Sequence, residues 1–411
     1  MSMFDAKTIQ KDFPQLQRKI HGKRIVYLDS TATSLKPQSV IDKEDEYYTL
    51  YTANVFRGIY TTSEEATAAY EHARDVAATL IHAKMSEEIV FTRNTSESIN
   101  LVAYSLLLHD ISPGERIVTT IMEHHSNFVP WQQLGKERGV AVDIWNLTPE
   151  GELDLGDLEK LVTRKTRIVA VTAASNVLGT INPISKIVRT VKRLNSKCLV
   201  LVDAAQAVPH MPVDVQEWGA DFVAFSSHKM LGPTGIGVLW ANREQLDAMH
   251  PFNYGGEMIS EVHVDRTVFK PAPHKFEAGT PHIAGVIGFG AAVEYLMKLG
   301  LDNVRAHEEA LVAYAIEQFS RMSEVKYLGP QDAKKRGGVF AMTMKGAHPH
   351  DIAQILNEDN VFVRAGNHCA MPLHENLGVA STVRASFYVY TAKEDIDVLM
   401  ESLGKVKKIF G

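Results

Sequence analysis

Hydrophobic and polar positions alternate between residues 80 and 240 in a pattern that predicts a layered α/β fold. Short runs rich in β-branched residues are separated by longer amphipathic stretches, as expected for strands joined by crossover helices in a mostly parallel sheet. The expected strands are Ile89–Thr92, Arg116–Thr120, Val140–Trp145, Ile168–Thr172, Leu199–Val202 and Phe222–Phe225. Clusters of polar residues follow these runs. Because ligands bind beyond the carboxyl ends of such strands, we expect the clusters to converge on one site.

The spacing of apolar and polar residues changes after residue 252. A Gly255-Gly256 pair and the alternating stretch Val262–Val268 predict a hairpin. The remainder predicts two helices broken at Gly300, then a strand, a helix, a short strand and a closing helix, namely Ala291–Leu299, Asn303–Met322, Val339–Met344, Pro349–Glu358, Val361–Val363 and a segment from Lys393. These elements suffice for a second, smaller α+β domain.

Composition and charge narrow the function. The chain has 411 residues, 45% hydrophobic and 22% charged, as in globular proteins of about two or three domains. Its formal net charge of -6 provides no basic field for a nucleic-acid backbone or an anionic membrane. The segment Met1–Lys7 is charged and lacks the apolar core of a secretory signal, and no segment approaches the about 18 apolar residues that span a bilayer. We therefore expect a cytoplasmic protein with neither nucleic acid nor membrane as a partner.

Lys229 is the first candidate for chemistry. It follows an apolar strand within Ser226-Ser227-His228-Lys229 and precedes a glycine-containing turn. There a lysine could form a Schiff base while Ser226 and His228 hold a phosphate. A solvated surface lysine is the alternative.

Asp203 ends the very apolar run Leu199–Val202. A carboxylate is costly to bury unless a cation faces it, and a pyridinium nitrogen would be such a partner. Gln206, one turn further on, could then donate to the ring hydroxyl oxygen. A helix N-cap is the alternative role for Asp203.

Two further polar clusters follow strands. Thr95 and Ser96 open a helix, where hydroxyls and free N–H groups make an anion site, although simple helix capping explains the same residues. His124 could stack on an aromatic cofactor and exchange protons, or it could be a structural histidine.

The chain has only two cysteines, far apart, which excludes a disulfide framework and a CxxC-type metal site. Cys369 lies in a glycine-containing loop beside His368 and Arg364, and positive neighbours favour the nucleophilic thiolate. Cys198, inside an apolar run, suits a buried small hydrophobe. Arg364 and Arg384 could each bind a substrate carboxylate or form a structural ion pair.

These motifs, taken in order over nearly the whole chain, resemble the class V aminotransferase family and, within it, the Suf-type cysteine desulfurases, also called selenocysteine lyase-like. The matching segments are Val26–Ser30, Arg57-Gly58, Asn94–Asn100, Met122–Asn127, Ser175–Gly179, Asp203–Gln206, Ser226–Lys229, Phe276–Pro281, the Cys369 loop and Val383–Ser386.

The resemblance implies a fold-type I homodimer that uses pyridoxal 5'-phosphate. A large cofactor domain would span residues 21–295, and a small domain carrying the cysteine loop would combine residues 1–20 and 296–411. The residues expected to bind the cofactor are Lys229 covalently, Asp203 at the pyridinium nitrogen, Gln206 at the ring oxygen, His124 against the ring, Asn176 beside it, and Thr95, Ser96, Ser226, His228 and the partner subunit's Thr280 at the phosphate. Asn176, Arg364 and Arg384 would hold the substrate.

The implied reaction converts L-cysteine to L-alanine and leaves a persulfide on Cys369, with Lys229 and His124 as the other catalytic residues. The sulfur would pass to an acceptor or scaffold protein for iron–sulfur cluster assembly. L-Selenocysteine is a second possible substrate. Another pyridoxal-phosphate reaction, such as selenocysteine lysis, transamination or epimerisation, and a non-catalytic sulfur-relay protein stay open as alternatives. Phe56, Lys275 and Asn367 depart from the residues commonest in the family.

Overall fold

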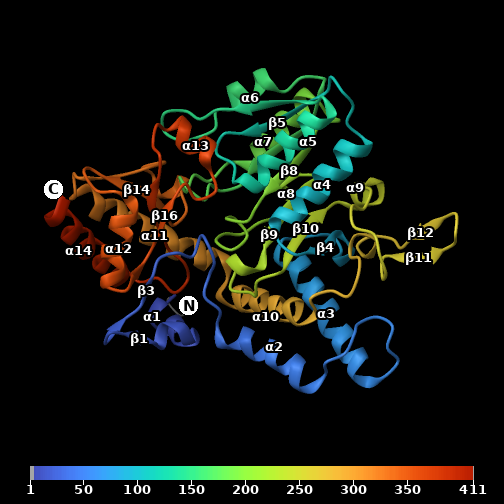
Figure 1. The fold of residues 1–411 in the computed structure, drawn as a ribbon, viewed down its shortest axis with the longest axis horizontal. Helices are drawn as coiled ribbons and strands as arrows, with labels where there is room; N and C mark the ends of the chain where they lie inside the picture. The colour runs from blue at the N-terminus through green and yellow to red at the C-terminus, as the bar shows by residue number, and fades with distance from the viewer. Residues whose placement is uncertain (1–3, 411) are drawn as a thin grey trace.

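The computed structural model describes residues 4–410, and residues 1–3 and 411 of the expected small domain lie outside this range. A seven-stranded sheet forms the centre of the larger unit (Figure 1). Its strands, in spatial order, are β4 (Ile89–Thr92), β10 (Gly237–Ala241), β9 (Phe222–Ser226), β8 (Leu199–Asp203), β7 (Thr166–Thr172), β5 (Arg116–Thr120) and β6 (Ala141–Trp145). The strands from β9 to β6 are parallel, and β10 is antiparallel to both of its neighbours.

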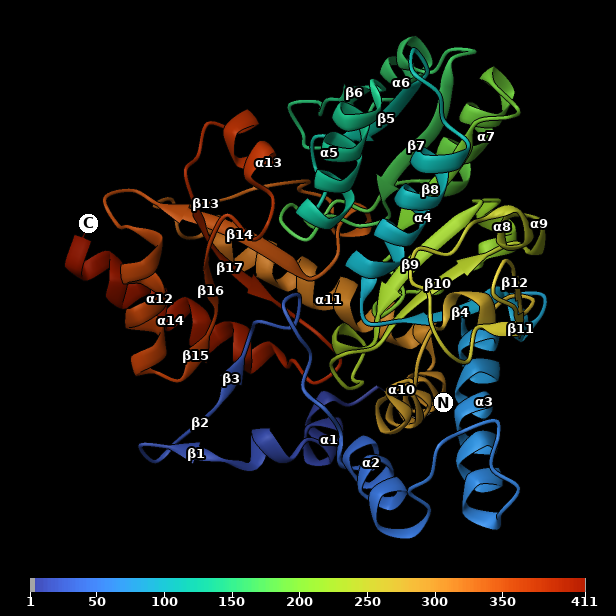
Figure 2. The same cartoon turned by 45° about the vertical axis from the view of Figure 1, so that its right-hand side comes forward.

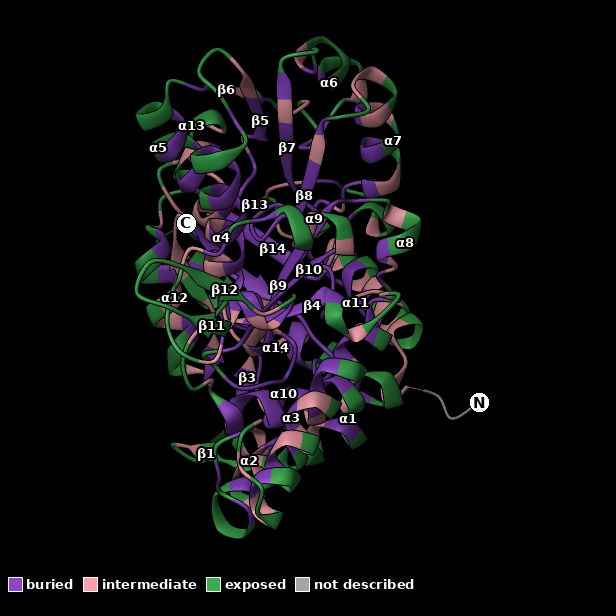
Figure 3. Ribbon diagram, turned by 90° about the vertical axis from the view of Figure 1, so that its right-hand side faces the viewer, coloured by how far each residue is buried: buried purple, intermediate pink, exposed green. Residues whose placement is uncertain are grey.

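The apolar runs of this sheet are continuous because both of its faces are covered. Successive residues of β7 enter different cores: Val169 and Val171 pack in one hydrophobic cluster, and Ile168 and Ala170 pack in the other. A strand covered by helices on both faces has no polar side, so its sequence does not alternate. Figure 3 shows the central strands buried along most of their length.

Helices surround the large sheet. They are α2 (Gln38–Leu50), α3 (Thr61–Leu80), α4 (Thr95–His109), α5 (Val129–Arg138), α6 (Leu155–Leu161), α7 (Ile184–Leu194), α8 (Val215–Trp218), α9 (Arg243–Ala248) and α10 (Ile283–Leu299). Helices α2, α3 and α10 pack together beside the sheet (Figure 2). The predicted hairpin is present as β11 (Ile259–Val262) and β12 (Thr267–Phe269), and both strands are largely exposed (Figure 3).

The smaller unit is a four-stranded antiparallel sheet covered by helices (Figure 2). Its strands are β13 (Val325–Tyr327), β14 (Val339–Met344), β17 (Thr382–Ser386) and β16 (Arg364–Gly366), and its helices are α11 (Leu301–Ser320), α12 (Pro349–Glu358), α13 (Met371–Asn376) and α14 (Lys393–Phe410). The N-terminal segment adds α1 (Ala6–Ile9), β1 (Lys19–Ile20), β2 (Lys23–Arg24) and β3 (Val26–Tyr27).

The N-terminal segment packs with the C-terminal residues. Strand β3 pairs with β15 (Val361–Phe362), and Val26 and Leu28 lie in the same hydrophobic cluster as residues of α11 and β14. The domain division at residues 20 and 295 stays a prediction. This packing favours placing the N-terminal boundary several residues later.

The predicted α/β class is confirmed, and β4, β5, β14 and α12 have the expected bounds. The sequence did not predict strands β1, β2, β3, β10, β13, β16 and β17. Among residues 4–410, no single helix is long and apolar enough to cross a membrane, and only the pair α10 and α11, bent by 72°, passes a length and composition test when joined.

Candidate active site

A cavity of about 410 Å³ lies where the carboxyl ends of the parallel strands meet the small unit. All of the candidate residues except Gln206 and Thr280 line it. The lining consists of Thr31, Ala32, Asn94, Thr95, Ser96, His124, Ser126, Asn176, Asp203, Ala205, Ser226, His228, Lys229, Arg364, His368, Cys369 and Arg384. The convergence expected from the strand ends is therefore observed.

Lys229 and Asp203 both line this cavity. Lys229 ends a short 3-10 turn directly after β9, and Asp203 is the last residue of the neighbouring strand β8. Burial lowers the pKa of Lys229, an effect that Asp203 and, to a smaller extent, Cys369 oppose. Burial also raises the pKa of Asp203, and Lys229 opposes that shift. Lys229 is thus not a surface lysine, and Asp203 caps no helix, because no helix begins beside it.

The start of α4 supplies hydroxyl groups to the same cavity. The Ser226 hydroxyl accepts a hydrogen bond from the backbone N–H of Thr95 at 2.8 Å and lies 2.5 Å from the Thr95 hydroxyl. Asn94 caps the helix by accepting from the N–H of Glu97, so the capping interpretation of this segment also holds. The helix N-terminus and its hydroxyls make a site suited to an anion.

His124 is held in one orientation. Its Nδ1 accepts a hydrogen bond from the N–H of Ser126 at 3.1 Å and lies 3.0 Å from the Ser126 hydroxyl, which is itself 2.5 Å from Ser96. Burial lowers the pKa of His124 to about 3, so the ring is neutral at neutral pH. A neutral imidazole whose Nδ1 accepts from Ser126 carries its proton on Nε2, so it can stack on a ring and donate a hydrogen bond.

The loop that carries Cys369 is fastened to the large unit on both sides of the thiol. The Asn176 side chain donates to the His368 carbonyl at 2.8 Å, and the His125 N–H donates to the Cys369 carbonyl at 2.7 Å. The N–H of Met371 donates to His125 Nε2 at 3.0 Å. His368 and Cys369 both have positive φ angles, 51° and 58°, a conformation that non-glycine residues seldom adopt. These hydrogen bonds hold the exposed thiol in the cavity.

Both candidate arginines lie beside this loop. Arg384 is almost fully buried, and it donates to the Asn176 carbonyl at 3.0 Å. Arg364 donates to Asp29 at 2.8 Å, and Arg384 lies 3.5 Å from the same carboxylate. Arg364 and Arg384 thus take part in an ion-pair cluster and line the cavity as well.

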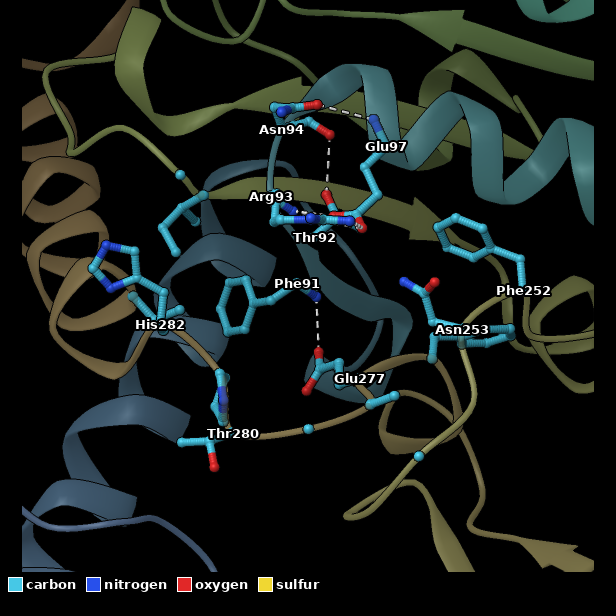
Figure 4. Close-up of a pocket in the computed structure, with 18 of the residues that line it drawn as sticks. Phe91, Thr92, Arg93, Asn94, Glu97, Phe252, Asn253, Glu277, Thr280 and His282 are labelled. Carbon is cyan, nitrogen blue, oxygen red and sulfur yellow. Dashed lines mark hydrogen bonds and ion pairs between the residues drawn. The ribbon is translucent and has the colours of Figure 1, made fainter.

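Gln206 and Thr280 are the exceptions. Gln206 is buried, and its amide nitrogen donates to the Thr31 carbonyl at 2.9 Å, which leaves Oε1 without a hydrogen-bond partner among residues 4–410. The expected donor role of Gln206 is therefore not supported, because its free group is the acceptor oxygen. Thr280 lines a different, larger cavity of about 970 Å³ together with Phe91, Arg93 and Glu277 (Figure 4). Asn94 and His228 line both cavities, so the two spaces meet at the hydroxyl-rich end of the site.

Several site residues were missed from the sequence. Thr31, Ser126 and His368 line the cavity, and Asp29 pairs with both arginines. Thr31 follows the short strand β3, so the rule of polar residues after strands could have found it. The role of Asp29 depends on contacts with residues more than 300 positions away, which no local pattern contains.

The three departures from the family pattern lie in different places. Phe56 does not line the cysteine cavity but packs edge-on against Tyr70 and His274. Lys275 donates to the Asp247 carbonyl. Asn367 is in the cysteine loop, where its carbonyl accepts from the N–H of Ala370.

Comparison with known proteins places this site in a family. Residues 26–399 match the model of the family described as "Aminotransferase class-V". The chain is 47% identical to a probable cysteine desulfurase of Streptomyces coelicolor, over 100% of this chain and 99% of that protein. It is also 47% identical to one of Halalkalibacterium halodurans, over 99% of each. A solved apo structure of a cysteine desulfurase from Thermococcus onnurineus superimposes with a TM-score of 0.94 at 41% identity, with complete coverage of both chains. The chain therefore belongs to the class-V aminotransferase family.

Proposed function

We propose that this protein is a pyridoxal-phosphate-dependent cysteine desulfurase that converts L-cysteine to L-alanine and leaves a persulfide on Cys369. The observation that carries the proposal is the presence of Lys229 and the exposed Cys369 thiol in one cavity. A thiol in another cavity would have ruled out direct transfer. The similar proteins of Streptomyces coelicolor and Halalkalibacterium halodurans are named as probable cysteine desulfurases.

The residues present fit pyridoxal phosphate. The buried Asp203 carboxylate suits a protonated ring nitrogen, the unpartnered Gln206 Oε1 suits a ring hydroxyl donor, and the α4 N-terminus suits a phosphate. Lys229 would hold the group covalently, His124 would lie against its ring, and Thr95, Ser96, Ser226 and His228 would contact its phosphate. When bound, the cofactor supplies an electrophilic carbon for the substrate amine and an electron-withdrawing ring.

The protein residues then bind the amino acid and move its protons. Arg384, with Arg364 and Asn176 beside it, would hold the substrate carboxylate. Because burial lowers the pKa of Lys229, a larger share of its amine is neutral at neutral pH than for a solvated lysine. The neutral Nζ can accept the proton from the substrate Cα and return one to Cβ. His124, also neutral, would carry its proton on Nε2 because its Nδ1 accepts from Ser126, so it would act on this path as a donor.

Sulfur transfer uses the Cys369 thiolate as nucleophile. The Cys369 sulfur attacks the substrate sulfur, and the bond between the substrate sulfur and Cβ breaks. The electron pair of that bond stays on Cβ, which is protonated, and the product leaves as alanine. One cysteine and one thiol therefore give one alanine and one persulfide, with no external oxidant or reductant. The loop hydrogen bonds from Asn176 and His125 keep the attacking sulfur in the cavity.

A homodimer is part of the proposal. Thr280 does not line the Lys229 cavity of its own chain but lies in the larger cavity with Asn94 (Figure 4). Asn94 and His228 line both cavities, so the larger cavity meets the phosphate end of the Lys229 site. A second copy seated in the larger cavity would bring the partner's Thr280 to the phosphate.

The short, fastened cysteine loop favours the Suf-type subgroup. Only Asn367 to Ala370 separate β16 from α13, which leaves no long arm to carry the persulfide away. We infer that an acceptor or scaffold protein docks at the cavity mouth to receive the sulfur, with iron–sulfur cluster assembly as its destination.

The test compares two cysteine variants of the cofactor-loaded protein. With L-cysteine, the wild-type chain should form alanine and a persulfide on Cys369 that mass spectrometry detects. Cys369→Ser should keep the cofactor absorbance and lose both products, while Cys198→Ala, which changes the buried thiol, should form both. Alanine and persulfide formation by Cys369→Ser would refute the role of the thiol.

The alternatives give other results in the same assay. A transaminase would release a keto acid, an epimerase would produce D-amino acid, and a sulfur-relay protein would bind no pyridoxal phosphate. A selenocysteine lyase would release alanine from L-selenocysteine but not from L-cysteine.

A further inference from the structure

Two guanidinium groups stand opposite each other beside the cysteine cavity. Arg364 of β16 and Arg384 of β17 are direct partners in the antiparallel pairing of these strands. Like charges in this position destabilise a sheet unless an anion lies between them. Both side chains also line the cavity that contains Cys369. We call the part of the cavity beside Arg364 and Arg384 the carboxylate-binding corner. Its net charge depends on which groups neutralise the two arginines.

Asp29 supplies the anion from the opposite end of the chain. Its Oδ2 accepts from Arg364 Nη2 at 2.8 Å and from Arg364 Nε at 3.1 Å, and its Oδ1 lies 3.5 Å from Arg384 Nη2. The Asp29 and Arg384 side chains are only 13% and 3% exposed, so solvent screens their interaction weakly, whereas Arg364 is 51% exposed and its pair with Asp29 is screened more strongly. Asp29 follows β3, whose pairing with β15 brings it to the small sheet.

The charges of this cluster do not cancel. Arg364, Arg384 and Asp29 leave one positive charge, and His368 adds none because burial and the arginines lower its pKa to about 2. Lys229 and Asp203, which line the same cavity, carry opposite charges and offset each other. We propose that Asp29 sets the net charge of the carboxylate-binding corner at one, so that it accepts a single ligand carboxylate and discriminates against a second negative charge. Asp29 is thus a positioning and specificity residue. The identification of the ligand as an amino acid rests on the proposed function.

The chain contains a reporter of this charge. Cys369 is exposed, whereas Cys198 is buried and its pKa is raised by burial to about 12, so alkylating reagents react at Cys369. Iodoacetate is anionic and iodoacetamide is neutral, and both attack the same thiolate. The ratio of their rate constants therefore cancels the thiolate fraction and measures the local potential. This measurement does not depend on turnover.

The expected result is a change in that ratio. Asp29→Asn should raise the iodoacetate-to-iodoacetamide ratio about 3- to 10-fold at low ionic strength, and less at high salt, because one added charge within the cavity acts at short range. Arg364→Gln removes a positive charge and should lower the ratio. Arg364→Gln keeps the proposal testable if Asp29→Asn does not fold.

Asp359→Asn is the matched control. Asp359 also lies between two cations, 2.8 Å from Lys23 and 2.5 Å from Lys405, and its side chain is 12% exposed, but it lines a different cavity. Its replacement should leave the ratio unchanged. An unchanged ratio in Asp29→Asn, or the same change in both aspartate variants, would overturn the charge assignment.

Ligand binding tests the specificity. Calorimetry on the cofactor-loaded protein compares L-alanine with L-cysteate, which carries an added sulfonate. Asp29→Asn should increase the affinity for L-cysteate relative to that for L-alanine by about tenfold. An equal loss of affinity for both ligands would overturn the proposed discrimination and leave Asp29 a structural residue. Absence of alanine formation by the wild-type chain would remove the proposed function without affecting the alkylation ratio.

Discussion

Replacing Asn176 by alanine should release the cysteine loop without unfolding the protein. The Asn176 side chain donates to the His368 carbonyl, one of three hydrogen bonds that fasten this loop. The loop holds His368 and Cys369 at positive φ, which costs about 1–2 kcal/mol for each non-glycine residue. Each fastening bond contributes about 0.5–1.5 kcal/mol net, so the bonds and the backbone strain are of similar size.

Loss of one bond should therefore shift the balance toward an open loop. An opening free energy lower by about 0.5–1.5 kcal/mol corresponds to an open population about 2- to 10-fold larger. Hydrogen exchange measures this change at the amides of Ala370 and Met371, which are bonded to the Asn367 carbonyl and to His125 Nε2 in the closed loop. Their exchange should accelerate by the same factor, and persulfide formation should slow.

Asn182→Ala provides the comparison. Asn182 is buried to a similar extent and donates to the Thr172 carbonyl at 2.8 Å, away from the loop. Both variants should lose about 1–3 kcal/mol of stability through an unpaired carbonyl. Only Asn176→Ala should accelerate exchange at Ala370 and Met371. If exchange there stays unchanged, or rises equally in Asn182→Ala, the strain argument is refuted.

Three further predictions concern the substrate, the partner subunit and acid stability. Arg384→Lys should raise the KM for L-cysteine about 10- to 100-fold because an ammonium group cannot bind a carboxylate bidentately; an unchanged KM in steady-state assays would remove Arg384 from substrate binding. A mixed dimer of one Thr280→Val chain and one Lys229→Ala chain should bind cofactor at its single intact Lys229 with wild-type affinity, because the partner of that site keeps its Thr280. A wild-type chain paired with a chain that carries both substitutions should bind cofactor more weakly. Equal affinities of the two dimers in spectroscopic titrations would contradict a contribution of Thr280 across the interface. The folded chain holds His124 with a pKa of about 3 against an ordinary value of 6.5, so between these pH values the unfolded chain binds more protons and the free energy of unfolding falls as pH falls. His124→Gln should reduce that fall by about 2–4 kcal/mol in denaturant titrations of the cofactor-free protein, and identical pH profiles would show that His124 is not buried as a neutral group.

The strands and most of the site followed from local patterns for a physical reason. A buried parallel strand needs a run of apolar residues, and the residue after it lies at the edge where the strands end together. Lys229, Asp203 and Thr95 each follow such a run, so their convergence could be expected before any coordinates were known. Strand β16 was not expected, because its three residues, Arg364–Gly366, have no apolar repeat. The direct pairing of Arg364 with Arg384 was therefore also unforeseen.

The sequence by itself predicted the α/β class, the chemistry of the candidate residues and the choice of Cys369 over Cys198 as the candidate nucleophile. Only the tertiary structure decided that Asn176 and His125 fasten the cysteine loop, that Gln206 presents an oxygen, and that Thr280 faces a different cavity. Local periodicity reports which side of an element is buried, but it contains no information on which distant segment covers that side. Contacts such as the one between Asp29 and Arg364 form only when distant segments pack together. These contacts decide which charged groups lie beside one another in the site.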